Sequence, residues 1–219
     1  MTPTAARRER ICLFTRYPEA GTTKTRLIPA LGPAGAADLQ RRMTRHILKE
    51  ARQAARLRPA VVEIRYAGGG RRKMRQWLGA DLRYQAQASG DIGQRMARAA
   101  QDAAADGCPA VIIIGSDIPG ITAAVVVGAF ERLATNDLVI GPAIDGGYYL
   151  IGLRLPPPGQ AVPALFTDIA WGTATVRADT LARAASLNLR PILLTPLNDV
   201  DRPEDLVHWQ KIDKTSPAP

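Results

Sequence analysis

The feature that most constrains the fold of this 219-residue chain is the alternation of short aliphatic runs with longer amphipathic stretches. The runs predict strands over residues 11–15, 60–66, 82–85, 111–114, 138–140, 148–153 and 192–194. This alternation is typical of an α/β protein with a largely parallel sheet and helices on both faces. Only a short glycine-containing turn separates the fifth and sixth runs, so we expect two consecutive strands there and a mixed sheet.

The stretches between the strands have apolar residues at helical spacing. They predict helices over residues 33–57, 71–78, 92–105, 122–134, 173–187 and 203–212. At this length one compact domain is the default, because two domains would each have a small interior. We therefore expect a single nucleotide-binding transferase domain over 1–219, with 1–8 and 214–219 frayed.

The chain carries 29 Lys and Arg against 20 Asp and Glu, a net charge of +9. Such a charge indicates either an anionic partner or a solvated basic surface, and charge alone does not choose between them. A nucleic-acid-binding protein is disfavoured, because no aromatic side chains are interleaved with the arginines to stack on bases. The apolar stretch 11–14 is too short for a signal sequence or a membrane span, and only two cysteines are present, so we expect a cytoplasmic protein.

The first predicted strand is followed by a loop that combines hydroxyls, glycine and cations. Gly21, Thr22 and Thr23 precede the closely spaced Lys24 and Arg26. Backbone N–H groups, hydroxyls and two cations suit a polyphosphate, whose oxygens accept charge-assisted hydrogen bonds. The segment lacks the glycines of a P-loop, so a Walker fold is not supported. A solvated turn with two surface cations explains this loop, taken by itself, equally well.

Acidic residues follow three later strands, at Asp117, at Asp145 and at the pair Asp199 and Asp201. A carboxylate at the end of a buried strand can hold Mg²⁺ or Mn²⁺ against the phosphates of a ligand. Turn or helix-capping aspartates are the alternative, and the Asp145-Gly146 step can be a tight hairpin turn. Cations and carboxylates around one rim suit a metal-bound polyphosphate better than a duplex.

Residues 18–27, 89–96, 115–120, 141–153 and 198–206, read together, resemble a bacterial glycosyltransferase-like family described as radical-SAM/selenodomain-associated transferases. That family resembles the GT-A, or nucleotide-diphospho-sugar transferase, superfamily, which also includes molybdenum-cofactor and phospholactate guanylyltransferases. The resemblance implies a Rossmann-like mixed sheet with a nucleotide over the first strand's loop.

The same resemblance implies roles for individual residues. Lys24 and Arg26 match the basic loop that contacts phosphates, Asp117 matches a metal aspartate, and Asp199 or Asp201 matches a late acidic position. Arg95 is expected to reach the nucleotide. Two departures stand out: Thr23 replaces the aliphatic residue that usually precedes the lysine, and residues 115–117 hold one aspartate instead of the Asp-X-Asp of many sugar transferases.

The resulting hypothesis is a metal-dependent transferase that uses a nucleotide-sugar or nucleoside triphosphate donor and an unknown small-molecule acceptor. Lys24 and Arg26 would offset charge on the leaving phosphate, and Asp145 would orient or deprotonate an acceptor hydroxyl beside Tyr148 and Trp171. The transferred group is left open between a sugar and a nucleotidyl unit released with pyrophosphate. A non-catalytic nucleotide-binding protein is the third alternative, and the oligomeric state is not predicted.

Overall fold

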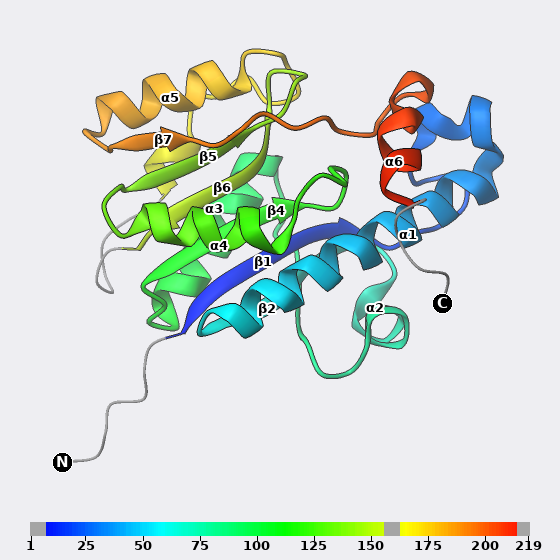
Figure 1. Ribbon diagram of the computed structural model, residues 1–219, viewed down its shortest axis with the longest axis horizontal. Helices are drawn as coiled ribbons and strands as arrows, with labels where there is room; N and C mark the ends of the chain where they lie inside the picture. Colours follow the sequence, from blue (N-terminus) through cyan, green and yellow to red (C-terminus); the bar gives the residue numbers. More distant parts are fainter. Residues whose placement is uncertain (1–7, 156–162, 214–219) are drawn as a thin grey trace.

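The structure, a computed structural model, describes residues 8–155 and 163–213. The predicted frayed ends, 1–7 and 214–219, lie outside this part, whereas Arg8 is exposed and directly precedes the first strand. The core of the molecule is one seven-stranded sheet in the order β3-β2-β1-β4-β6-β5-β7 (Figure 1). Its strands are β1 Glu9–Arg16, β2 Ala60–Ala67, β3 Arg83–Ala86, β4 Ala110–Gly115, β5 Leu138–Pro142, β6 Tyr148–Arg154 and β7 Pro191–Leu193.

Six of these strands run parallel to one another, and β6 runs antiparallel between β4 and β5. The mixed sheet is therefore confirmed, and all seven predicted strands are present. The carboxyl ends of the parallel strands share one edge of the sheet, where β6 begins. Loops at such an edge are the usual ligand-binding loops of α/β proteins.

Helices cover both faces of the sheet, as expected. They are α1 Ile28–Leu57, α2 Gly70–Leu78, α3 Ile92–Ala105, α4 Ala123–Leu133, α5 Val176–Ser186 and α6 Leu206–Asp213. One buried cluster joins the sheet to α1, α2 and α4, and a second joins it to α3 and α5. Figure 1 shows α1 and α4 in front of the sheet and α3 behind it. A helix is present in each of the six predicted stretches.

Helix α1 begins five residues before the predicted start, at Ile28 instead of residue 33. Gly32 interrupts it with φ 68° and ψ 167°, and Pro33 opens the segment that continues to Leu57. Proline suits this place because its missing N–H would have no helical acceptor in a first turn. A short 3-10 helix at Thr25–Leu27, which was not predicted, directly precedes α1, and a second one at Pro203–Asp205 forms the first turn of the helix predicted over 203–212.

The C-terminal segment folds back onto the beginning of α1. Leu27, Met43, Val200 and Trp209 form one buried cluster. Figure 1 correspondingly shows α6 beside the start of α1. The loop after β1 and the acidic segment before α6, far apart in the sequence, are therefore held side by side.

A buried ionic network ties β1 and β2 to α3. Arg10 and Arg65 both contact the carboxylate of Glu63, at 3.3 Å for Arg10. Arg10 also pairs with Asp106 at 2.6 Å, and Arg65 pairs with Asp102 at 2.8 Å. The side chains of Arg10, Glu63 and Arg65 are only 3%, 6% and 3% exposed. Each buried charge in this network therefore depends on the others for compensation.

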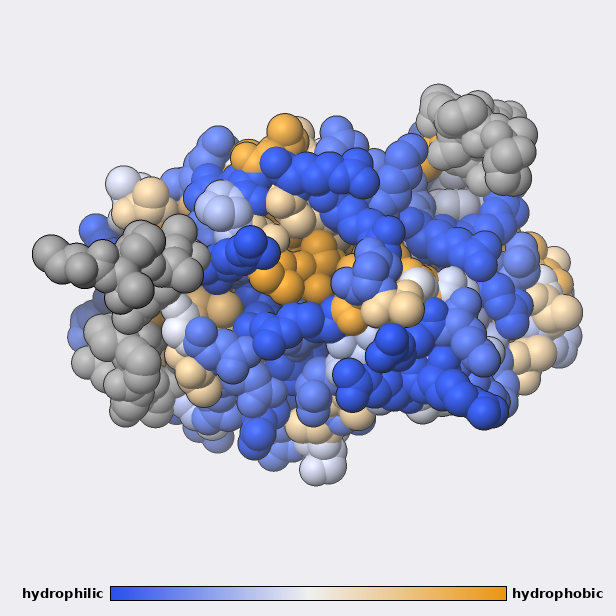
Figure 2. All heavy atoms as spheres, turned by 90° about the horizontal axis from the view of Figure 1, so that it is seen from below, coloured by the Kyte–Doolittle hydropathy of each residue, from blue (hydrophilic) through white to orange (hydrophobic). Residues whose placement is uncertain are grey.

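The surface is largely polar, and no helix in residues 8–155 and 163–213 is long and apolar enough to cross a membrane. Figure 2 shows one mostly hydrophilic face that opens near its middle onto apolar residues in a hollow. On α1, Arg45, Lys49 and Arg56 are exposed, as expected for a solvated basic face.

Asp137 gives the fold a measurable dependence on acid. Burial raises its pKa, but hydrogen bonds from Arg154 and Arg190 outweigh this and lower the pKa to about 2. A carboxyl with a lowered folded-state pKa contributes stability above its unfolded pKa, which is lost as the pH falls from about 4 to 2. We expect Asp137→Asn to lower the melting temperature at pH 6, with the difference from wild type shrinking by pH 2. A constant difference across thermal melts at both pH values would contradict this.

Candidate functional site

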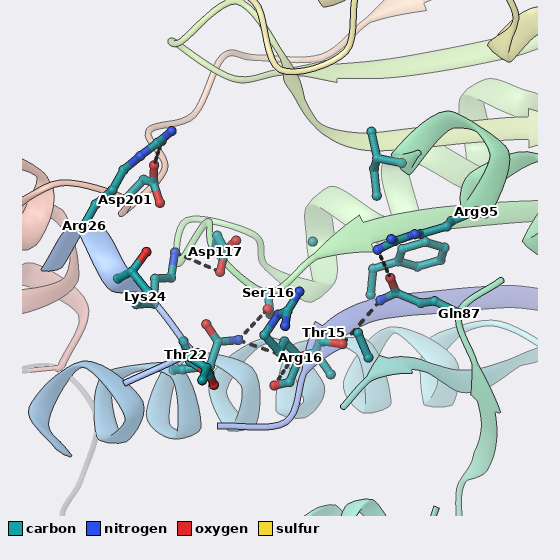
Figure 3. Close-up of a pocket in the computed structure, with 17 residues that line it drawn as sticks. Thr15, Arg16, Thr22, Lys24, Arg26, Gln87, Arg95, Ser116, Asp117 and Asp201 are labelled. Carbon is teal, nitrogen blue, oxygen red and sulfur yellow. Dashed lines mark hydrogen bonds and ion pairs between the residues drawn. The ribbon is translucent and has the colours of Figure 1, made fainter. Parts of the chain in front are cut away.

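A cavity of about 470 Å³ lies at the carboxyl edge of the sheet, between the loops that follow β1, β3 and β4. Figure 3 shows its polar side chains converging from these loops and from the C-terminal segment. The polar and charged residues of its lining are Thr15, Arg16, Thr22, Thr23, Lys24, Thr25, Arg26, Gln40, Gln87, Arg95, Ser116, Asp117 and Asp201. The cavity therefore presents cations, hydroxyls and carboxylates together.

Lys24 is held at this cavity by two contacts from distant parts of the chain. Its Nζ lies 3.0 Å from Oδ1 of Asp117 and donates a hydrogen bond of 2.6 Å to the carbonyl oxygen of Val200. The side chain is only 5% exposed, whereas that of Asp117 is 51% exposed. The backbone at Lys24 is left-handed, with φ 50°, and this turns the chain from the loop into the 3-10 helix. The ammonium group is thus both buried and precisely located.

The loop that carries Lys24 is closed by Thr23. Its hydroxyl donates to the carbonyl of Tyr17 and accepts from the N–H of Glu19, both at 3.2 Å. Thr23 is buried, which explains in physical terms how a hydroxyl serves where the resembling family has an aliphatic residue. Gly21 is exposed with φ 84° and is absent from the cavity lining, so its contribution is to the turn.

A second cation–carboxylate pair joins the same two segments. Arg26 pairs with Asp201, and their side chains are 65% and 36% exposed. Both residues line the cavity (Figure 3). Because this pair is open to solvent, its Coulomb energy is small. A ligand can therefore replace either residue as the partner of the other at little cost in free energy.

Beneath the cavity lies a buried hydrogen-bond network that the sequence analysis missed. The Gln40 Nε2 atom lies 3.0 Å from Thr44 Oγ1, 3.3 Å from Thr15 Oγ1 and 2.9 Å from Ser116 Oγ. Ser116 immediately precedes Asp117, so the network fixes the strand end that presents this carboxylate. The signal was available: Gln40 and Thr44 are polar residues on the otherwise apolar face of a predicted helix.

Arg95 also lines the cavity, and its side chain is hydrogen-bonded to Gln87, a second amide that the sequence analysis missed. Arg95 donates to Oε1 of Gln87 at 3.3 Å and to the carbonyl of Gly90 at 3.0 Å. Gln87 in turn donates to the carbonyls of Thr15 and Arg65 at 3.3 and 3.0 Å. The guanidinium group is therefore oriented by the loop that precedes α3, as Figure 3 shows.

A larger cavity of about 750 Å³ adjoins the first and shares Phe14, Arg26, Ile92, Gly115, Asp117 and Asp201 with it. Asp145 and Asp199 line only this second cavity, and Tyr148 and Trp171 belong to its wall. Oδ1 of Asp145 accepts a 2.9 Å hydrogen bond from the N–H of Gly147. Of the predicted site residues, all but Gly21 therefore line one or both of two adjoining cavities.

The carboxylates around the second cavity have the chemistry of a divalent-cation site. Burial raises the pKa of Asp199, and the charges of Asp145, Asp205 and Asp201 raise it further. A bound cation would relieve that repulsion, and carboxylate oxygens are the ligands that Mg²⁺ and Mn²⁺ prefer. Within the described part of the chain, however, no three His, Cys, Asp or Glu side chains gather closely enough to hold a metal ion. A metal there would need phosphate oxygens of a ligand as additional partners.

Comparisons with known proteins point to one superfamily. Residues 47–173, more than half of the chain, match the family described as "Uncharacterized protein conserved in bacteria (DUF2064)". A phosphoenolpyruvate guanylyltransferase of Chloroflexus aggregans is 29% identical over 192 residues, which cover 82% of this chain and 88% of that protein. A crystal structure of a putative nucleotide-diphospho-sugar transferase from Desulfovibrio desulfuricans G20 is 36% identical with a TM-score of 0.82, covering 95% and 88% of the two chains.

A more distant structure shares the fold. A Mycobacterium tuberculosis protein solved in complex with manganese is 15% identical, with a TM-score of 0.52, and the match covers 96% of this chain and 100% of that one. At this identity the likeness concerns the fold alone.

Proposed function

Because the chain belongs to the DUF2064 family and has the fold of the nucleotide-diphospho-sugar transferases, we propose that it is a nucleotidyltransferase acting on a nucleoside triphosphate and a small acceptor. Its similarity to a named guanylyltransferase and to the structure of a putative nucleotide-diphospho-sugar transferase identifies it as a transferase. The guanylyl transfer named for its relatives favours the nucleotidyl alternative over sugar transfer and makes GTP the first donor to test.

One observation supports this proposal above the others: Lys24 Nζ and Asp117 Oδ1 face each other at 3.0 Å in the wall of the smaller cavity. A cation and a carboxylate in this arrangement can bind a polyphosphate in two complementary ways. The ammonium group binds phosphate oxygens directly, and the carboxylate binds them through a metal ion. Gly115 leaves the space above this strand end open, because no atom lies within 4 Å of the position its Cβ would take.

The proposed reaction is an in-line displacement at the α-phosphorus. An acceptor oxygen forms a bond to this phosphorus, and the bond to the oxygen bridging the α- and β-phosphates breaks, with its electron pair leaving on pyrophosphate. Lys24, Arg26 and Arg95 would compensate the charge on the phosphates. If the acceptor oxygen is a hydroxyl, its proton must be removed, and Asp145 in the adjoining cavity is our candidate for accepting it.

A divalent metal, Mg²⁺ or Mn²⁺, would be held by Asp117, with Asp199 or Asp201 as the candidate second ligand, and by oxygens of the donor phosphates. When bound, it would neutralise phosphate charge and act as a Lewis acid. In this proposal the ion pairs of Lys24 with Asp117 and of Arg26 with Asp201 loosen when the donor enters, since each cation then turns to phosphate oxygens.

Three finer statements belong to the proposal. We propose that the chain belongs to the radical-SAM/selenodomain-associated subgroup of the superfamily, on the resemblance of its motifs. Residues 1–219 constitute one catalytic domain. The protein acts in the cytoplasm on small molecules, and nucleic acid is not its substrate.

The proposal is tested by a screen of nucleoside triphosphates and nucleotide sugars for thermal stabilisation with Mg²⁺ or Mn²⁺. A ligand that binds only the folded state raises the melting temperature. We expect a triphosphate, GTP first, to stabilise the chain most and to be turned over with release of pyrophosphate. Release of a nucleoside diphosphate from a nucleotide sugar would instead establish sugar transfer. Absence of binding by every nucleotide would refute the nucleotide site.

Lys24→Ala should reduce kcat/KM for pyrophosphate release by about 10²-fold, because one charge-assisted donor to the phosphates is lost. Steady-state kinetics measure this effect. Lys49→Ala is the matched control, since Lys49 is exposed on α1 and lines neither cavity. The thermal melt of the Lys24 variant reports the separate loss of its contact with Val200. Equal kinetics for the two variants would remove Lys24 from the proposed site.

A further inference from the structure

The floor of the larger cavity is apolar, although its rim is acidic. Phe14, Met96, Ile113 and Ile151 line the cavity and belong to one buried core cluster. Their exposed fractions are 8%, 6%, 4% and 1%. These residues come from β1, α3, β4 and β6, so the sheet and α3 together provide the floor. Rigid elements of this kind hold a fixed shape for a ligand.

Two aromatic rings extend this floor into a wall. Tyr148 and Trp171 lie edge to face with ring centroids 6.5 Å apart, and both pack on the same core cluster. The indole of Trp171 rests against the first turn of α3 at Gly93. A Cβ at Gly93 would lie 2.3 Å from the indole ring, so only glycine permits this close packing. The position of Trp171 in this wall therefore depends on glycine at residue 93, which does not itself line the cavity.

Large apolar side chains are also left open to water at the cavity. Ile92 is 40% exposed and Ile144 is 63% exposed, and both belong to the lining. Exposed apolar groups that surround a concave site are typical of a surface that a ligand covers. A volume of about 750 Å³ is moreover within the range, about 300–1,000 Å³, that holds a drug-sized molecule.

The charged side chains of this cavity come from the surrounding loops. They are five carboxylates and two guanidinium groups, from Asp117, Asp145, Asp199, Asp201, Asp205, Arg26 and Arg202. Asp205 already accepts hydrogen bonds from the backbone N–H groups of Asp201 and Arg202. A small acceptor with several negative charges would find few cations here and would leave the apolar floor uncovered.

We propose that the acceptor carries an apolar body, a ring or a branched chain, behind the oxygen that reacts. The reacting oxygen lies at the acidic rim beside the donor, and the apolar body lies on the Phe14, Met96, Ile113 and Ile151 floor against Trp171. This inference rests on the proposed nucleotidyl transfer and adds the class of acceptor. It distinguishes this chain from an enzyme built for a compact polyanion such as phosphoenolpyruvate.

The experiment measures binding of methyl, phenyl and 1-naphthyl phosphate and of phosphoenolpyruvate by calorimetry. Each titration contains Mg²⁺ and the α,β-methylene analogue of the triphosphate that stabilises the chain most, so that no turnover occurs. Burial of an aromatic ring predicts that phenyl phosphate binds at least about ten-fold more tightly than methyl phosphate. We expect the naphthyl compound to bind at least as tightly as the phenyl compound, and phosphoenolpyruvate to bind more weakly than either.

Matched variants locate the effect. Ile144→Asp and Leu57→Asp place the same charge on side chains that are 63% and 65% exposed, and only Ile144 belongs to the cavity. We expect Ile144→Asp to reduce the preference for aryl phosphates and Leu57→Asp to leave it unchanged. Trp171→Ala removes the indole and Gly93→Ala displaces it, so both variants should show a smaller preference for aryl phosphates. Thermal melts report whether each variant folds.

The outcomes separate the two proposals. Equal affinity for methyl, phenyl and naphthyl phosphate in the wild type, or no detectable binding of any of the three, would overturn the acceptor inference while the nucleotide analogue still binds. An aryl preference that survives both Ile144→Asp and Trp171→Ala would also overturn it. Failure of the nucleotide analogue to bind would overturn the proposed function and the acceptor inference together.

Discussion

Asp117→Asn should lower kcat/KM for pyrophosphate release by about 10³-fold with no loss of the folded structure. The substitution keeps the shape of the side chain but removes the charge that, in the proposed function, would hold a divalent cation against the donor phosphates. It also removes the negative partner of Lys24, 3.0 Å away. Asp117 itself is 51% exposed, but the Lys24 side chain is only 5% exposed and would keep the carbonyl of Val200 as its hydrogen-bond partner, so its buried charge loses compensation. We therefore expect a large kinetic effect together with a lower melting temperature, and the thermal melt shows whether the variant is folded at the assay temperature.

The measurement is steady-state pyrophosphate release over a range of Mg²⁺ concentrations. Asp38→Asn is the control, since Asp38 is an exposed carboxylate on α1 that lines neither cavity. We expect the Asp117 variant to need more Mg²⁺ for its residual rate and the Asp38 variant to behave as wild type. Wild-type turnover by Asp117→Asn would show that this carboxylate does not act in the reaction.

Glu63→Gln should reduce the free energy of unfolding by about 3–5 kcal/mol. Glu63 lies between Arg10 and Arg65, and all three side chains are at most 6% exposed. Without its charge, two buried guanidinium groups face each other with only Asp106 and Asp102 to compensate them. Most of this cost comes from buried positive charge that cannot regain water.

Urea unfolding at pH 7, monitored by circular dichroism, measures the loss in the free energy of unfolding. Asp81→Asn provides the contrast, because it breaks the 2.9 Å pair of Arg52 and Asp81, whose side chains are 35% and 68% exposed. We expect that exposed pair to contribute at most about 1 kcal/mol. Similar losses for the two variants would mean that the buried network is no more stabilising than a surface ion pair.

Much of the fold could be predicted from the sequence because buried apolar residues recur at the regular spacing of strands and helices. The strand of residues 111–114 is apolar at every position, which is typical of a central parallel strand, and it became β4. The helix predicted over 92–105 has the bounds of α3, where Asp91 and Gln94 form a capping box. The resemblance further directed attention to Lys24, Arg95 and Asp117, which line the same cavity.

The features that were missed depend on contacts between distant residues. Gln40 bonds to Ser116, 76 positions away, and no local pattern encodes that partner. The predicted start at residue 33 coincides with the segment that Pro33 opens after the non-helical Gly32, whereas the preceding turn from Ile28, which packs at the cluster around Leu27, was missed. Local propensity is a weak guide wherever tertiary packing decides the backbone.

The hydrogen bond from Lys24 to Val200 spans 176 residues and has a consequence for synthesis. Once β1 to β7 have been synthesised, every strand of the sheet is present, but the loop that carries Lys24 still lacks the carbonyl that orients the lysine. A growing chain can thus acquire its hydrophobic core well before it can hold a nucleotide. In the proposed function, nucleotide binding therefore requires that the segment before α6 has been synthesised.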